Sequence, residues 1–348
     1  MGTGKGTAGV TGRGRVVHVV CTTAFAGVER YVANVAPHLA RRGWDVVVVG
    51  GDSVRMQEAI GEVPQVSFGS TLGVIAVLAR FDRSTIVHTH MTAAEIAAAA
   101  ARVARRFPIV TTRHFAARRG TNPVVRIAAP AILRSIAAQI SVSDFVASAI
   151  GEASTTVHSA VADDALASGD GRTVLMVQRL EPEKRTADAV RAWAATALPE
   201  DGWRLLIAGD GSEHIQLTAL SRELGVADTC QFLGPRNDVN ELMSQASIFV
   251  ATTSIEAFGL SVVEAMAAGL PVICARGGAH LETVGAVSSQ WLFEPGDSAA
   301  IAKMLQSLAT DRVERKRYGR ALQQWQRSTL SIESHVDQLE RIYARLQP

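Results

Sequence analysis

Cysteine is scarce in this sequence, and its cysteines are not spaced as metal ligands or as a disulfide framework. Cys21, Cys230 and Cys274 form an odd, scattered set without a CxxC motif. No apolar run reaches the roughly eighteen residues that suggest a membrane-spanning helix, and the opening MGTGKGTAGVTGRGR lacks the apolar core of a signal peptide. These absences predict a cytoplasmic protein without disulfides or a spanning helix.

Two common nucleotide-binding fingerprints are missing as well. The string GTGKGT at residues 2–7 has the look of a P-loop, but no strand precedes it and Lys5 is followed by Gly6 instead of Ser or Thr. The first strand pattern is not followed by GxGxxG, the dinucleotide-binding motif. With 47% hydrophobic and 20% charged residues, the composition also excludes a disordered chain.

Charge is nearly balanced in total but not along the chain. The net charge is +2, yet residues 1–160 hold 17 Lys and Arg against 9 Asp and Glu, and the remaining residues hold 18 against 24, so the parts carry +8 and −6. Such a basic part attracts anions. Its excess lies between positions 96 and 143, where no acidic residue separates Arg102, Arg105, Arg106, Arg113, Arg118, Arg119, Arg126 and Arg134. Two interpretations of the loop arginines 113, 118 and 119 stay open: contact with an acidic acceptor or a membrane surface, or plain solvent exposure.

Strand and helix patterns alternate in the first half of the chain. The apolar run RVVHVVC at 15–21 predicts a buried parallel strand, an amphipathic helix follows at 30–43, and another strand pattern, WDVVVVG, comes at 44–50. Gly27 lies in the turn between the first strand and the helix. This βαβ opening predicts a doubly wound domain, in which ligands bind at the carboxyl ends of the strands.

Histidines lie on or after two further predicted strands. His88 and His90 alternate on the strand at 84–90, which points both side chains to one face. They could bind a metal ion, but no third ligand lies at suitable spacing, so a structural or acceptor-pocket role is favoured. His114 follows the strand that begins at Pro108 and so lies at its carboxyl edge. After a helix at about 124–138, segment 139–150 is predicted to be a strand.

Two carboxylates organise the region 251–283. Glu256 and Glu264 are eight residues apart, so both fit on one face of a helix. We expect the helix itself at 261–269 with Ser261 as N-cap, after the permissive backbone of Gly259. Free N–H groups at a helix N-terminus bind anions such as a pyrophosphate.

Two cations precede this region in the same half of the chain. Arg179 and Lys184 flank a turn after an apolar strand that begins at Thr173. Converging cations of this kind neutralise a diphosphate, whereas either one alone is more typical of solvated surface charge.

The segment ATTSIEAFGLSVVEAMAAGLPVICARGG resembles the signature of the retaining glycosyltransferases of family 4 (GT4), which have the GT-B fold. AGVERYVANVAPHLARRGWDVVVVG and QRLEPEK resemble further elements of that family. The departures are small: Thr252 and Thr253 stand where Pro-Ser is usual, and Ala257 and Gln178 where glycine is usual. The interdomain motif NGVD is replaced by VHSAVAD.

The resemblance implies roles for particular residues. Glu256 would contact the donor sugar, Glu264 would hold the ribose hydroxyls, and His114 would lie beside the transferred sugar. Arg179 and Lys184 would neutralise the leaving diphosphate. The other donor contacts that it implies are Gly27, Gly209, Leu233, Phe258, Gly259 and Leu260.

The implied fold is α/β GT-B, with two Rossmann-like, doubly wound domains facing each other across a cleft. A length of 348 residues independently favours two domains. We expect an N-terminal acceptor-side domain at 15–160 and a C-terminal nucleotide-sugar donor domain at 170–330. Residues 331–348 are expected to cross back and pack on the N-terminal domain.

The implied function is transfer of a hexose from a UDP- or GDP-linked donor to an acceptor hydroxyl, with retention of the anomeric configuration. No metal, obligatory cofactor or nucleic-acid partner is expected. The basic part favours an anionic or lipid-linked acceptor of cell-envelope glycolipid or polysaccharide synthesis, reached by peripheral contact at the inner face of the membrane. A small natural-product acceptor such as an aminocyclitol fits the chain length too. The other classes considered are an epimerase or phosphorylase of the same fold and a non-catalytic sugar-nucleotide-binding partner protein.

Overall fold

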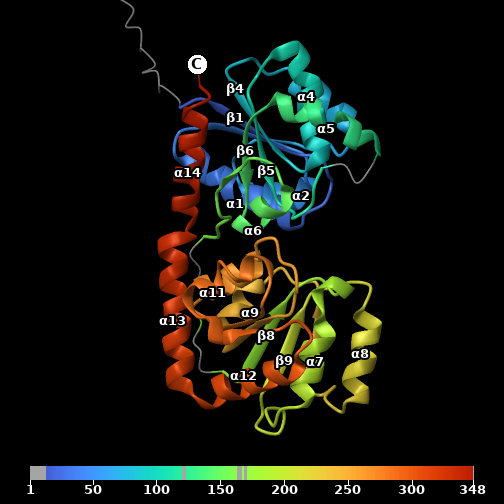
Figure 1. Ribbon diagram of the computed structural model, residues 1–348, viewed down its shortest axis with the longest axis vertical. Helices are drawn as coiled ribbons and strands as arrows, with labels where there is room; N and C mark the ends of the chain where they lie inside the picture. Colours follow the sequence, from blue (N-terminus) through green and yellow to red (C-terminus); the bar gives the residue numbers. More distant parts are fainter. Residues whose placement is uncertain (1–12, 120–122, 163–166, 168–170, 348) are drawn as a thin grey trace, which may run out of the picture.

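Two parallel sheets with helices on both faces make up the computed structural model, which describes residues 13–119, 123–162, 167 and 171–347 (Figure 1). The GTGKGT string and parts of the segment between the two sheets lie outside the described residues. The first sheet has the strand order β3-β2-β1-β4-β5-β6-β7 and the second β10-β9-β8-β11-β12-β13. This confirms the predicted α/β class with two doubly wound domains.

The first sheet and its helices are built from the following elements: β1 (Arg15–Val20), α1 (Gly27–Arg41), β2 (Asp45–Val49), α2 (Ser53–Ile60), β3 (Gln65–Val66), α3 (Thr71–Leu78), β4 (Thr85–His90), α4 (Thr92–Arg105), β5 (Ile109–Arg113), α5 (Pro123–Ser135), β6 (Ile136–Ser141), α6 (Asp144–Ile150) and β7 (Thr155–Thr156).

The second sheet and the helices around it comprise β8 (Thr173–Val177), α7 (Thr186–Ala194), β9 (Arg204–Ala208), α8 (His214–Glu223), β10 (Cys230–Gly234), α9 (Val239–Gln245), β11 (Ile248–Ala251), α10 (Leu260–Ala267), β12 (Val272–Ala275), α11 (Val284–Val287) and β13 (Leu292–Phe293). Three longer helices end the chain: α12 (Ser298–Thr310), α13 (Arg312–Thr329) and α14 (Ile332–Ala344).

The central strands are buried along their whole length. Every residue of β4, β5, β11 and β12 is buried, because helices cover both faces of a parallel sheet. Apolar side chains fill most of these positions, as the continuous apolar runs predict. The polar residues in β4 and β5 must therefore find partners inside the protein, and those partners bear on the functional site.

Two local predictions were wrong. Helix α10 begins at Leu260 instead of Ser261, with Gly259 as its N-cap residue at φ +86°, a left-handed conformation that glycine adopts without strain. Glu256 consequently lies in the loop before the helix and not on the same helical face as Glu264. Segment 139–150 is not one strand, because β6 ends at Ser141 and the side chain of Ser143 caps a new helix, α6.

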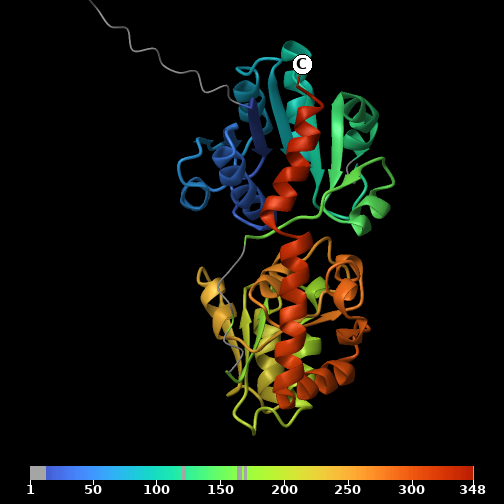
Figure 2. The same ribbon diagram turned by 90° about the vertical axis from the view of Figure 1, so that its left-hand side faces the viewer.

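The last two helices join the halves of the molecule. Helix α13 runs along the second sheet's half and α14 along the first (Figures 1 and 2). Apolar side chains of α14 belong to the same core as those of β1 and α1; they are Ile332, Val336, Leu339 and Tyr343. The domain bounds 15–160 and 170–330 stay a proposal. Among the described residues, no helix combines the length and apolar character that crossing a membrane requires.

Candidate active site

Lys184 and Glu256 form a partly buried ion pair at the edge of the second sheet. Lys184 ends a short 3-10 turn, Pro182–Lys184, that follows β8, and Glu256 lies in the loop after β11. Lys184 Nζ donates to Glu256 Oε2 at 2.9 Å, and the two side chains are only 17% and 19% exposed. Since β8 and β11 are neighbouring parallel strands, both residues lie at the sheet's carboxyl edge, where α/β proteins bind ligands.

Two consecutive glycines hold the loop that carries Glu256. A Cβ atom on Gly277 would lie 2.1 Å from the Ser254 carbonyl oxygen, and one on Gly278 would lie 2.2 Å from the Glu256 carbonyl oxygen. That oxygen accepts a 2.9 Å hydrogen bond from the Ala279 N–H. Gly278 also has φ +54°. Close backbone packing that only glycine permits therefore fixes the position of Glu256.

His280 is a site residue that sequence reasoning missed, although it follows those glycines directly. It is fully buried, and its Nδ1–H donates to the Ala275 carbonyl at 2.9 Å. In the neutral ring Nε2 then carries no proton, and it has no hydrogen-bond partner in the described part of the chain. Burial lowers the pKa of His280, while the nearby Glu256 carboxylate acts in the opposite direction. The ring borders Gly259, since a Cβ there would lie 3.5 Å from Nε2.

Arg179 does not share a partner with Lys184. Its guanidinium donates to Glu183 at 2.7 Å, and both side chains are largely exposed, at 65% and 56%. A pair this open to water holds its side chains weakly. Arg179 thus contacts Glu183 while Lys184 contacts Glu256, so these two contacts do not show the expected convergence of the cations. The role of Arg179 in the reaction stays a prediction.

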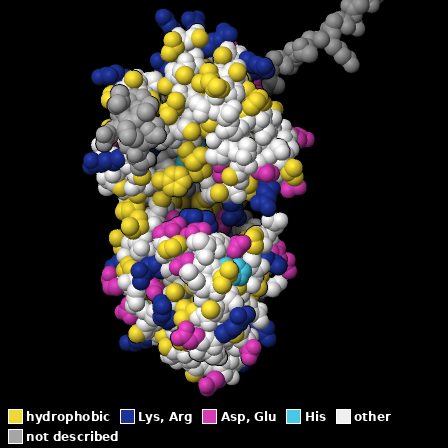
Figure 3. Space-filling model, turned by 90° about the vertical axis from the view of Figure 1, so that its right-hand side faces the viewer, with side chains coloured by type: hydrophobic (Ala, Val, Ile, Leu, Met, Phe, Trp, Pro, Cys, Tyr) yellow, Lys and Arg dark blue, Asp and Glu magenta, His cyan; other side chains and the backbone are white. Residues whose placement is uncertain are grey.

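Glu264 faces the N-terminal half of the protein. It lies on α10, is 9% exposed, and its Oε1 is 3.5 Å from Nη2 of Arg30 on α1. The structure thus places Arg30 against the carboxylate that is expected to hold the ribose. The molecule is hollowed between its halves, with acidic and basic side chains gathered on one wall and hydrophobic ones on the other (Figure 3).

The residues expected at the α10 N-terminus differ in how much of them a ligand could contact. Gly259 and Leu260 form the N-cap and first residue of the helix, whose free N–H groups suit an anion. Phe258 is only 4% exposed. Its ring belongs to a hydrophobic cluster between the halves, whose members include Val142, Val146, Ile150, Val263, Ala267 and Ala279. The Phe258 ring thus helps to join the domains, and the expected donor contact of this residue stays a prediction.

The other predicted donor contacts lie at the carboxyl edges of the two sheets. Gly209 follows β9 with φ +138°, and a Cβ there would lie 1.9 Å from the Gln178 carbonyl oxygen, so glycine is required for packing. Leu233 is half-buried in β10. Gly27 is exposed at the start of α1, with open space around its Cα. Their contacts with a donor remain predictions.

Polar contacts also fasten α6 to the C-terminal half. The carboxylate of Glu282 accepts from the backbone N–H groups of Asp144 and Phe145, each at 2.8 Å, and lies 2.9 Å from His158 Nε2. The Ser143 hydroxyl donates to the Ala257 carbonyl oxygen at 2.6 Å. Asp144, His158 and Glu282 are close enough to bind a metal ion, but Glu282 already serves as an interdomain contact.

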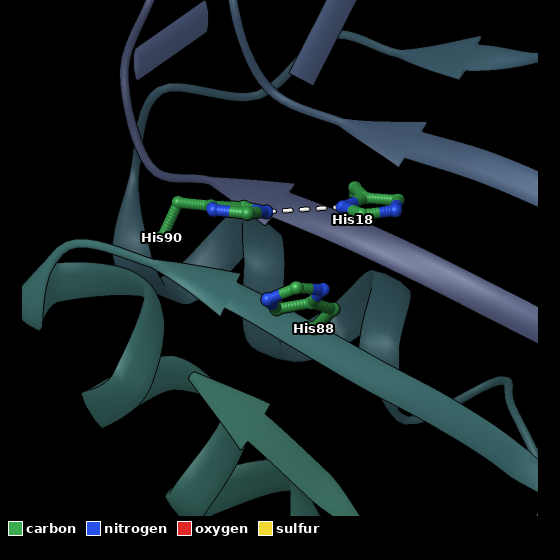
Figure 4. A group of neighbouring side chains, drawn as sticks. All are labelled: His18, His88 and His90. Carbon is green, nitrogen blue, oxygen red and sulfur yellow. Dashed lines mark hydrogen bonds between the residues drawn. The ribbon is translucent and has the colours of Figure 1, made fainter. Parts of the chain in front are cut away.

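The histidines of the N-terminal half form a buried group with a member that was not expected. His18 on β1 lies beside His88 and His90 of β4, so the expectation that no third metal ligand is near was wrong (Figure 4). His88 is fully engaged, with its ring nitrogens 2.6 Å from the Tyr343 hydroxyl and 2.7 Å from the Thr112 hydroxyl. Hydrogen bonding thus already occupies this ring, which favours the structural role over a metal site.

The basic loop after β5 is largely neutralised inside the protein. Arg119 donates to Glu95 at 2.7 and 2.8 Å and also pairs with Glu152, and Arg113 lies 3.7 Å from Glu152. Arg113 and Arg119 are 8% and 7% exposed, so neither open interpretation, contact with an acceptor or membrane or plain solvent exposure, describes them. Glu95 precedes the acid-free stretch 96–143 in the sequence and Glu152 follows it. In the folded protein both carboxylates contact arginines of that stretch. Arg118 alone of the three is exposed.

Family models match both halves of the chain. Residues 161–325 match the model "Glycosyl transferases group 1", and residues 25–156 match "Glycosyltransferase Family 4". The chain belongs to the group 1 glycosyltransferases.

Similar proteins of this kind include a phosphatidyl-myo-inositol mannosyltransferase of Mycobacterium leprae, which is 28% identical over 87% of this chain and 89% of its own length. The 2-deoxystreptamine glucosyltransferase of Streptomyces kanamyceticus is 31% identical over 40% of this chain. For three of the curated relatives the matched segment spans only 22%, 45% and 37% of the relative's length.

The Anabaena protein Alr3699/HepE, solved in complex with UDP-glucose, superimposes with a TM-score of 0.82 at 18% identity, covering 95% of this chain and all of its own. A likeness at that identity concerns the fold, and it confirms the GT-B arrangement of this group 1 glycosyltransferase.

Proposed function

We propose that the protein is a retaining hexosyltransferase that moves a sugar from a nucleotide diphosphate donor to an acceptor hydroxyl. The observation that carries this proposal is the Lys184–Glu256 pair beside the α10 N-terminus. Lys184 and the free N–H groups of α10 would stabilise the charge that develops on the leaving diphosphate, with Arg179 turning inward from its exposed position. Glu256 would then bind the sugar.

The donor is proposed from the same site. Glu264 would accept hydrogen bonds from the ribose hydroxyls, and Gly27, Gly209 and Leu233 would line the nucleotide. The UDP-glucose complex of the Anabaena protein supports a UDP-linked sugar, and a GDP-linked sugar is the alternative. An epimerase would release no free nucleotide diphosphate, whereas the transferase releases it only when an acceptor is present.

Retention and metal independence are tested together. We expect product whose anomeric configuration, measured by NMR coupling constants, equals that of the donor. The initial rate should be the same in excess chelator as in added Mg²⁺ or Mn²⁺, because protein groups supply the positive charge at the diphosphate. Inverted product would contradict the first part, and a rate lost to chelator and restored by metal would contradict the second.

Glu264→Gln is expected to weaken nucleotide binding about ten- to a hundredfold, since hydrogen bonds to a charged group contribute about 1.5–3 kcal/mol. Isothermal calorimetry with UDP and with GDP measures this effect. Glu223→Gln, at an exposed position of α8, is the matched control and should bind as the wild type does. Equal affinities for Glu264→Gln and the wild type would show that Glu264 does not bind the ribose.

For the acceptor we propose a cell-envelope glycolipid or polysaccharide precursor, reached by peripheral contact with an anionic membrane. The basic excess of residues 1–160 and the exposed Arg118 support this class, as does the similarity to the phosphatidyl-myo-inositol mannosyltransferase. We expect binding to anionic liposomes that weakens as salt is added. Indifference to liposomes would favour the second candidate, an aminocyclitol-like acceptor, which the 2-deoxystreptamine glucosyltransferase supports.

A further inference from the structure

Three imidazole rings form a line from the core of the N-terminal domain to its carboxyl edge. His18 Nδ1 lies 3.0 Å from His90 Nε2, and His90 Nδ1 lies 3.0 Å from His114 Nε2. His18 and His90 are fully buried on neighbouring strands, whereas His114 follows β5 and is half-buried. Figure 4 shows the first contact as a dashed line, with the rings of His18 and His90 in nearly one plane.

The outer end of this line lies at the sheet edge that faces the C-terminal domain. All strands of this sheet are parallel, so β5 ends at the same edge as β1. The helix after β1 carries Arg30, which contacts Glu264 across the interface. His114 is also the residue that the family resemblance implies beside the transferred sugar.

Each ring in the line carries one proton. Burial lowers the pKa of His18 and of His114 to about 3, and lowers that of His90 well below its usual value. All three are therefore neutral at pH 7. A neutral imidazole has one N–H donor and one bare acceptor nitrogen, and each contact between two nitrogens needs one proton.

Only two arrangements satisfy both contacts. In the outward arrangement, His18 Nδ1–H donates to His90 Nε2, His90 Nδ1–H donates to His114 Nε2, and His114 carries its own proton on Nδ1. In the inward arrangement, His114 Nε2–H donates to His90 Nδ1, His90 Nε2–H donates to His18 Nδ1, and His18 carries its proton on Nε2.

The inner end decides between them. His18 Nε2 is buried and has no hydrogen-bond partner among the residues that the structure describes. The inward arrangement would bury an N–H group there without an acceptor, whereas the outward one leaves only a bare lone pair. Orphaned buried N–H groups are the rarer of the two in proteins. The outward arrangement is therefore favoured.

We propose that His90 is a positioning residue that fixes His114 as the tautomer protonated on Nδ1, so that His114 offers the bound ligand a hydrogen-bond donor and not a lone pair. This inference rests on the proposed function only for the identity of the ligand, an oxygen atom of the sugar donor. Neither His18 nor His90 touches that ligand. His90 acts by directing the proton of its neighbour.

The test uses the ligand-free, full-length protein labelled with 15N at histidine. Long-range proton–nitrogen correlation spectra distinguish a protonated ring nitrogen from a bare one, and His114→Gln assigns the His114 signals by their loss. We expect a protonated Nδ1 and a bare Nε2. A His114 ring protonated on Nε2 in the wild type would overturn the proposal, and this measurement needs no folded variant of His90.

Two matched variants separate the effect of the hydrogen-bond direction from the effect of lost packing. His18→Leu and His90→Leu each remove one ring from the same buried group. His18→Leu only moves the bare inner end to His90 Nε2, so the His114 signals should keep their pattern. His90→Leu removes the donor, so protonated Nε2 should appear at His114. Identical His114 spectra in these two variants would overturn the proposal, because loss of packing alone predicts no difference.

Steady-state kinetics then tests whether His114 contacts the sugar donor. His90→Leu is expected to raise the KM for the donor about tenfold, the equivalent of one hydrogen bond, with a smaller change in kcat. A changed tautomer with an unchanged KM would support the proton arrangement and contradict the donor contact of His114. Failure of the proton arrangement and failure of the donor contact therefore give different results.

Discussion

Lys184→Ala is expected to lower kcat about 10²- to 10³-fold while the protein stays folded. Lys184 is held by Glu256 at 2.9 Å in a position largely closed to water. A charge fixed in advance near a leaving group stabilises the transition state without reorganisation, and removing one such group typically costs that factor. Initial rates at saturating donor measure the effect. Donor affinity, measured by calorimetry, should fall less than kcat, because the interaction is strongest in the transition state.

Arg191→Ala is the control for this prediction. Arg191 lies on α7 of the same domain, its side chain is 54% exposed, and its ion pair with Asp188 is long, at 3.8 Å. Such a pair contributes little, so kcat should stay within about twofold of the wild type. A folded Lys184→Ala variant with the wild-type kcat would show that Lys184 does not stabilise the leaving group, and the proposed site would lose its central cation.

The predictability of the fold follows from the type of sheet. Central parallel strands are covered on both faces, so β1 and β11 are nearly continuous apolar runs that can be located without a structure. Helix α8 was missed because it buries only Leu217 and Ser221. Two buried positions do not make the apolar stripe by which a surface helix is recognised.

The site was predictable as a set of residues but not as a set of contacts. Spacing and the family resemblance selected Lys184 and Glu256, which are 72 residues apart in sequence and adjacent in space. They could not select His18, whose relation to His90 depends on the register between β1 and β4. Nor could they reveal that Glu95 and Glu152 neutralise Arg119. Local patterns name candidates, and the pairing of distant segments decides what each one does.

Gly278→Ala is expected to lower both stability and activity, because this glycine supports Glu256. Its φ of +54° costs an L-residue about 1–2 kcal/mol. The new Cβ would in addition meet the Glu256 carbonyl oxygen at 2.2 Å and its nitrogen at 2.6 Å, and relieving such overlap costs about 1–3 kcal/mol more. Since the obstacle is backbone, the Glu256 loop must move. A displacement of about 1 Å at a reacting centre costs about 10²-fold in rate.

Gly225→Ala separates the two effects of that substitution. Gly225 follows α8 with φ +71°, and nothing lies within 4 Å of the position its Cβ would take, so the variant has the same backbone strain without the overlap. Thermal unfolding should show a smaller loss of stability for Gly225→Ala, and kcat should not change. If instead both variants lost the same stability and Gly278→Ala kept its kcat, close packing of the glycine loop would not set the position of Glu256. The carboxylate would then owe its place to Lys184 alone, and Lys184→Ala should affect sugar binding as well as the leaving group.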